Sequence, residues 1–160
     1  MRRHKLDRID RKILNDLQNN GRMTNVELAE RAGISAPPCL RRVRKLEESG
    51  FIKSYHASLD PTSLGYSVTV FAHVKLGSQS EGDLRKFEEA VAVMPEVREC
   101  HMLTGETDYM LKIVAKNWDA YQIFLTQTLT SAPSVASVRS SLRIRVTKES
   151  PGGPVDVMER

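Results

Sequence analysis

Four basic side chains lie close together in the stretch SAPPCLRRVRKLEESG, residues 35–50. Arg41, Arg42, Arg44 and Lys45 supply the charged hydrogen-bond donors that proteins use to bind phosphate oxygens and the edges of guanine bases. Such side chains also occur on helix faces that only meet water, so the elements around them must decide between a solvated face and a nucleic-acid contact.

A helix over this stretch would separate the basic side chains from the apolar ones. At 3.6 residues per turn, Cys39, Val43 and Leu46 form one apolar stripe with Leu40 beside it. A stripe of this kind packs on a core, so the basic side of the helix faces outward. The outward side comprises Pro38, Arg41 and Lys45, flanked by Arg42 and Arg44.

The start of this helix is unusual because Ser35 is followed by Pro37 and Pro38. Proline fits the first turn of a helix, where N–H groups have no intrahelical partner. The same prolines remove the N–H donors that a serine hydroxyl would cap. We therefore expect the Ser35 hydroxyl to remain available for a phosphate or a base.

Two further helices are predicted before the basic one. Asp7 can cap the first, in which apolar residues recur at helical spacing. The second begins with the capping box of Thr24 and Glu27 and ends at Gly33. The tight turn after this glycine is typical of a helix-turn-helix, which we expect over about residues 25–44.

The charge distribution supports a nucleic-acid partner for the N-terminal part of the chain. Residues 1–60 contain 13 Lys and Arg against 8 Asp and Glu, whereas residues 61–160 contain 11 against 12. A basic half joined to a neutral one is expected when only one half meets phosphate. After the basic helix, alternating residues predict a strand pair or wing with possible backbone contacts from Lys53 and His56. The alternating apolar positions are Phe51, Ile52 and Tyr55.

The C-terminal part of the chain predicts strands and helices in the order βαββαβ. Its first strand has apolar residues at every second position from Val68 to Leu76, followed by two amphipathic helices and three more strands. This order is the ferredoxin-like α/β sandwich, in which helices cover one face of an antiparallel sheet. A second copy could cover the other face, so we expect a dimer. The expected α+β organisation is a winged helix-turn-helix over 1–60, a linker over 61–66, the ferredoxin-like domain over 67–149 and a flexible tail over 150–160.

The same sequence contains no pattern typical of catalysis, metal binding or membrane insertion. The two cysteines lack a CxxC partner, and Cys100 and His101 would point to opposite faces of a strand. No run approaches the roughly 18 apolar residues of a membrane span, and the N-terminus lacks the apolar segment of a signal peptide. We expect a cytoplasmic protein with no enzymatic activity, cofactor or metal. The scattered titratable residues behind this expectation are His73, Glu99, Cys100, His101 and Asp108.

Three motifs in order, LDRIDRKIL, NVELAERAGIS with LRRVRKLEESGFI, and LTGETDYML, resemble the Lrp/AsnC (leucine-responsive, feast/famine) family of transcription regulators over about residues 6–148. The resemblance implies that double-stranded DNA is one partner and a small effector, commonly an amino acid, the other. It also implies dimers that assemble into octamers or related rings. Carried over by position, the DNA-binding residues would be Asn25, Ser35, Pro38, Arg41, Arg42 and Lys45, and the effector-binding residues Met102, Thr104, Gly105, Asp108, Tyr109 and Ser140.

The segment TGETDYM, residues 104–110, permits two interpretations from its residues alone. It could be a plain hairpin turn, since Gly, Thr and Asp all favour turns. Alternatively, Gly105 could expose backbone N–H groups to an α-carboxylate while Asp108 binds an α-ammonium group. With the family resemblance, the second interpretation predicts a regulator that responds to an amino acid. An architectural DNA-compacting protein without a ligand is the alternative.

Overall fold

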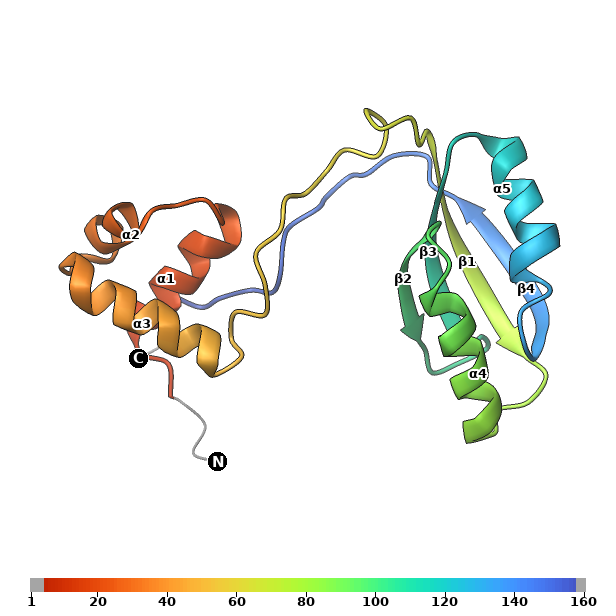
Figure 1. Cartoon of the computed structure of the whole chain (residues 1–160), viewed down its shortest axis with the longest axis horizontal. Helices are drawn as coiled ribbons and strands as arrows, with labels where there is room; N and C mark the ends of the chain where they lie inside the picture. Colours follow the sequence, from red (N-terminus) through yellow and green to blue (C-terminus); the bar gives the residue numbers. More distant parts are fainter. Residues whose placement is uncertain (1–4, 158–160) are drawn as a thin grey trace. The chain divides into compact units, whose positions relative to one another are not determined.

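The computed structural model describes residues 5–157 and divides the chain into two compact units. One unit contains the residues up to Ser58 together with those from Lys148 onward, and the other contains Leu59–Thr147. Each unit has its own hydrophobic core, so each is described by itself (Figure 1).

The first unit is built from three helices, α1 (Arg8–Asn19), α2 (Asn25–Ala32) and α3 (Ala36–Glu48). The predicted caps are confirmed. Asp7 and Asp10 form a reciprocal capping box at α1, and a second box caps α2. Gly33 ends α2 at φ 74°, a left-handed conformation that glycine adopts without strain.

The core of this unit lies between the three helices. Ala29 of α2 is buried there, and its small side chain allows α2 and α3 to approach closely. The predicted apolar stripe of α3 contributes as expected, with Cys39 and Leu46 fully buried and Val43 packed against them. The buried set is Ile13, Leu28, Ala29, Cys39 and Leu46.

The predicted strand pair after α3 is wrong for this structure. Residues 51–67 contain turns and irregular backbone, but no strand. A strand needs a ladder partner, and the alternating residues here find other contacts instead. Ile52 packs against the helical core, and the Tyr55 hydroxyl donates to Glu47 at 2.9 Å. In the tail, which the sequence predicts to be flexible, the Gly153 N–H donates to the Gln18 side chain at 3.0 Å.

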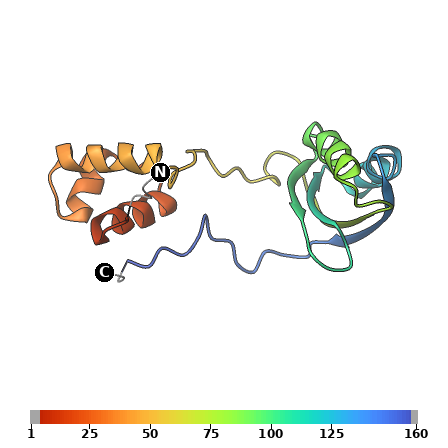
Figure 2. The same ribbon diagram turned by 90° about the horizontal axis from the view of Figure 1, so that it is seen from below.

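The second unit is the predicted βαββαβ arrangement. Its elements are β1 (Val68–Leu76), α4 (Glu81–Ala92), β2 (Val97–Met102), β3 (Tyr109–Ala115), α5 (Trp118–Phe124), which continues as a π-helical turn over Leu125–Leu129, and β4 (Val135–Leu142). The strands form one antiparallel sheet in the order β2-β3-β1-β4. Both helices lie on the same side of this sheet (Figure 2).

The alternation predicted for β1 is confirmed by its packing. Val70, Ala72 and Val74 are fully buried under α4 and α5. The residues between them, including Phe71 and His73, therefore lie on the face that the helices leave uncovered. The apolar stripe of β1 is thus satisfied within the chain and does not itself require a second copy. None of the helices described between residues 5 and 157 is long and apolar enough to cross a membrane.

Candidate DNA-binding and effector sites

The N-terminus of α3 has the open cap that the prolines predict. Ser35 is the N-cap residue, yet its hydroxyl makes no capping hydrogen bond. Pro37 and Pro38 occupy positions whose N–H groups would otherwise donate to it. Ser35 is exposed and Pro38 half-buried. A free hydroxyl therefore stands at the positive end of a helix, where anions are favoured.

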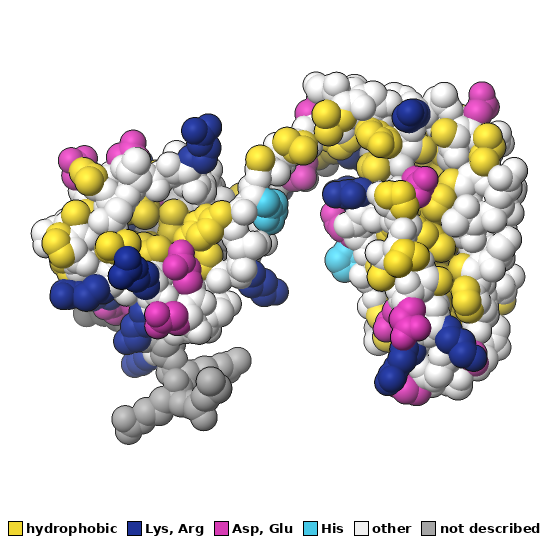
Figure 3. All heavy atoms as spheres, in the orientation of Figure 1, with side chains coloured by type: hydrophobic (Ala, Val, Ile, Leu, Met, Phe, Trp, Pro, Cys, Tyr) yellow, Lys and Arg dark blue, Asp and Glu magenta, His cyan; other side chains and the backbone are white. Residues whose placement is uncertain are grey.

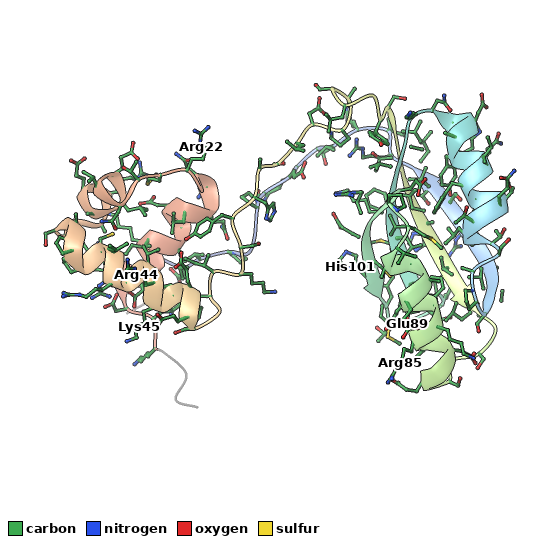
Figure 4. The ribbon with its side chains drawn as sticks, in the orientation of Figure 1. Arg22, Arg44, Lys45, Arg85, Glu89 and His101 are labelled. Atoms are coloured by element: carbon green, nitrogen blue, oxygen red, sulfur yellow. The ribbon has the colours of Figure 1, made fainter. Side chains whose placement is uncertain are left out.

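Three of the four basic residues of α3 point to solvent. Arg41, Arg44 and Lys45 are exposed, as helical spacing predicts. Arg44 and Lys45 extend from α3 in Figure 4, and Lys and Arg side chains gather over this helix in Figure 3. Cations on the outer face of the second helix of a helix-turn-helix are arranged to meet the DNA backbone and base edges.

Arg42 differs from its neighbours because its guanidinium binds within the unit. Its Nη1 lies 2.7 Å from an Asp7 oxygen and 2.6 Å from an Asp10 oxygen. The hydrogen bond to Asp10 raises the pKa of Arg42 above its ordinary value. Sequence reasoning assigned Arg42 to DNA, whereas the structure directs this side chain toward α1.

Asn25 also makes a contact within the unit. Its side-chain N–H donates to the Ala36 carbonyl at 2.8 Å, which ties the start of α2 to the start of α3. Its Oδ1 atom is buried and has no hydrogen-bond partner among residues 5–157. Asn25 therefore lies beside the N-terminus of α3, but one end of its amide already holds that helix in place.

In the second unit, the loop before β3 is organised by Asp108. This residue is buried, and its two oxygens accept hydrogen bonds from Leu76 N–H at 2.7 Å and from the Gln79 side chain at 2.6 Å. Gly105 has φ 129°, a backbone angle that other residues rarely adopt. The Asp108 carboxylate thus connects the Thr104–Asp108 loop to the end of β1 and to the loop that follows β1. Sequence reasoning missed both donors, which lie about thirty residues away along the chain.

Tyr109 directly follows this loop at the start of β3, but its side chain lies in the core. It is 1% exposed, its ring packs on Phe87 with 4.8 Å between the ring centroids, and its hydroxyl donates to Glu88 at 2.8 Å. Burial, followed by the bond to Glu88, raises the pKa of Tyr109. The alternation of residues along β3 could have predicted this burial, because Tyr109 shares a sheet face with the apolar Leu111.

The remaining effector candidates are dispersed over the sheet. Met102 is 59% exposed at the end of edge strand β2, and Thr104 and Gly105 are exposed in the loop that follows. Ser140 lies on the opposite edge strand, β4, where it shares a hydrogen bond with the Tyr121 hydroxyl. Three strand spacings of about 4.8 Å separate β2 from β4. A single chain therefore brings Met102, Thr104, Gly105 and Asp108 together, but not Ser140.

The arrangement defines a class of protein: a helix-turn-helix DNA-binding regulator with a separate second domain of ferredoxin-like fold. Comparison with known proteins then gives the family. Residues 6–53 match the winged helix-turn-helix DNA-binding model, and residues 69–152 match the Lrp/AsnC ligand binding domain. The chain belongs to the Lrp/AsnC family of transcriptional regulators, as its motifs predict.

Individual relatives match over nearly the whole length. The Leucine-responsive regulatory protein of Rhizobium meliloti is 51% identical over 92% of this chain and 94% of its own. The Bkd operon transcriptional regulator of Pseudomonas aeruginosa is 45% identical over 88% and 92%. Among solved structures, the complex of the Neisseria meningitidis transcriptional regulator NMB0573 with L-Met superposes with a TM-score of 0.91 at 38% identity, covering 95% of this chain and 98% of that one.

Proposed function

We propose that this regulator binds specific double-stranded DNA through α3 and responds to an amino acid bound by its second unit. The observation that carries the DNA part is the exposed cation set Arg41, Arg44 and Lys45 beside the uncapped Ser35. Ser35, Pro38, Arg41 and Lys45 are the proposed contact residues. Asn25 and Arg42 act indirectly, since their side chains are engaged within the unit.

The proposed effector site is the loop Thr104–Asp108 together with Met102. Thr104 and the backbone at Gly105 offer donors to an α-carboxylate, and the exposed Met102 offers an adaptable apolar surface to a side chain. An amino acid is the proposed ligand because a structural relative was solved with L-Met. Asp108 keeps the loop in shape. Tyr109 and Ser140 are left out, because their hydroxyls bind Glu88 and Tyr121.

We infer that the protein works as a homodimer that assembles further, to an octamer or a similar ring. The sheet face opposite the helices is the proposed contact surface. It includes Phe71, which lies opposite Lys112 in the strand register, and the ion pair of Lys112 and Glu99, whose atoms lie 2.7 Å apart. A mixed apolar and charged surface of this kind suits a subunit interface.

No catalytic role is proposed. The relatives are regulators, and residues 5–157 contain no group of three His, Cys, Asp or Glu side chains able to hold a metal ion. The proposed place of action is the cytoplasm, where the DNA of the bacterial relatives lies. An architectural DNA-compacting protein is the competing function, and it would need no effector.

A two-stage experiment distinguishes these functions. A thermal-shift screen of the full chain against the twenty amino acids should give at least one that raises the melting temperature, because a ligand of the native state stabilises it. Light scattering and DNA titration are then repeated with that amino acid. A changed subunit number or DNA affinity supports the regulator. If all twenty leave melting, assembly and DNA binding unchanged, the proposed amino-acid response is wrong and the architectural function is favoured.

A further inference from the structure

Arg42 occupies the middle of the helix that faces DNA, yet its charge is neutralised from within. Its guanidinium lies within 2.7 Å of both Asp7 and Asp10. Asp10 is 2% exposed and Arg42 31%, whereas Asp7 is 51% exposed, so the Asp10 side of this cluster is the one shielded from water. The guanidinium of Arg42 thus already donates hydrogen bonds to two carboxylates. A guanidinium paired in this way has less charge to offer to a phosphate.

The two carboxylates already serve α1, and Arg42 uses the oxygens that remain. One Asp7 oxygen accepts from the Asp10 N–H at 2.8 Å, and one Asp10 oxygen accepts from the Asp7 N–H at 3.2 Å. The other oxygen of each residue accepts from Arg42 Nη1. The two residues that cap α1 therefore also bind a side chain of α3. Removing Arg42 would take a guanidinium away from the buried Asp10 carboxylate.

This bridge helps to fix the rotation of α3 about its own axis, which the buried residues Cys39 and Leu46 also set. Neighbouring residues on a helix differ by about 100° in direction, so a side chain held at Arg42 sets the directions of Arg41 and Lys45. We propose that Arg42 is a positioning residue for DNA recognition. It acts through Asp10 to orient the exposed cations of α3 and makes no contact with DNA itself. The proposal rests on the DNA-binding function of α3.

The competing role for Arg42 is direct contact with DNA, and Asp10→Asn separates the two roles. This variant removes the charge of the buried carboxylate that binds Arg42, while the more exposed Asp7 stays in place. If Arg42 contacted DNA, releasing it would preserve or increase the preference for the correct sequence. If Arg42 positions α3, the preference falls because Arg41 and Lys45 lose their fixed directions.

The experiment uses the full chain and two DNA probes, a duplex that the wild type selects from a random pool and a scrambled duplex of equal length. We expect Asp10→Asn and Arg42→Met each to lower the affinity ratio between selected and scrambled DNA about tenfold. The double variant should lose no more than either single one, because both break one interaction. Circular dichroism checks that each variant remains helical at the binding temperature.

The matched control is Arg41→Met, one position earlier on the same helix. If Arg41 binds a phosphate, its loss lowers the slope of log affinity against log salt by about 0.9 on both duplexes. Arg42→Met should leave the slope on scrambled DNA at the wild-type value.

Three results would overturn the inference. A slope reduced in Arg42→Met as in Arg41→Met would make Arg42 a DNA contact. An unchanged affinity ratio in a folded Asp10→Asn would leave the bridge a stabilising feature only. A wild type that prefers no duplex would contradict the sequence-specific function together with this inference.

Discussion

The basic helix α3 and the loop Thr104–Asp108 use charged side chains in opposite ways. Among the basic side chains of α3, Arg41, Arg44 and Lys45 are exposed, whereas Arg42 is engaged within its unit. In the loop, Asp108 is buried and both of its oxygens accept hydrogen bonds from the chain. The helix thus offers its charges to a partner, whereas the loop uses its charge to keep its shape.

The largest expected effect tests whether the Asp108 carboxylate holds the Thr104–Asp108 loop in its conformation. Asp108→Ala removes the acceptor of the buried Leu76 N–H and of Gln79, so we expect the second unit to lose about 3 kcal/mol of unfolding free energy. Effector binding should be lost with it. Trp118 is the single tryptophan of the chain and lies in this unit, so urea unfolding followed by its fluorescence reports the loss.

The exposed Glu106 provides the control for this variant. Glu106→Ala changes a charge on the same loop but should leave the unfolding free energy within about 0.5 kcal/mol of the wild type. If Asp108→Ala were as stable as Glu106→Ala and lost only ligand affinity, Asp108 would be a ligand contact after all.

A smaller effect is expected from the backbone of the same loop. Gly105→Ala places a side chain at φ 129°, where we expect a cost of about 2 kcal/mol, although the new methyl group meets no atom within 4 Å. Gly82→Ala, within α4, is the matched control and should be neutral or slightly stabilising, since alanine favours helices. Equal fluorescence-detected stability in both variants would show that the loop accommodates an ordinary residue.

The smallest effect concerns the charge of Asp7 in the first unit. Burial raises the pKa of Asp7, but the N–H of Asp10 and the Arg42 guanidinium outweigh it, so the pKa lies below 3.8. Ionised Asp7 therefore stabilises the folded unit above that value, and the stabilisation is lost as the pH falls through the folded-state pKa.

Asp7→Asn isolates this charge, because asparagine caps a helix about as well as aspartate. At pH 6 we expect the variant to be less stable by under about 1 kcal/mol, since Asp7 is half exposed. The difference from wild type should vanish as the pH falls below about 3.8. Urea unfolding followed by circular dichroism measures it, and a difference that stayed constant as the pH fell from 6 to well below 3.8 would rule out the ionised carboxylate as its source.

The two regions also differ in how far the sequence predicts them. Helical periodicity correctly predicts the outward direction of Arg41 and Lys45, because a regular backbone fixes side-chain directions locally. The caps at Asp7 and Thr24 follow from neighbours three residues away. The elements and their order in the second unit follow equally from hydrophobic periodicity.

Contacts between distant segments could not be predicted in this way. Asp108 accepts a hydrogen bond from Gln79, which lies 29 residues away along the chain, and Arg42 donates to Asp10, which lies 32 residues away. Local patterns identify both as charged but do not indicate which distant segment they will meet. The prediction of a strand around Tyr55 was wrong for a related reason. Alternating residues show that a strand could form, but they do not show whether a second strand is present to pair with it.

The irregular segment 51–67 has a consequence for how such regulators diversify. The buried core residues of the first unit end at Leu46, and those of the second begin at Val70, so the two cores share no residue. Exchange of genetic material within the intervening stretch would join one complete core to another without cutting through either. A DNA-reading unit could thereby acquire a new sensor in a single recombination event, and of its own residues only the tail from Lys148 onward would be exchanged as well.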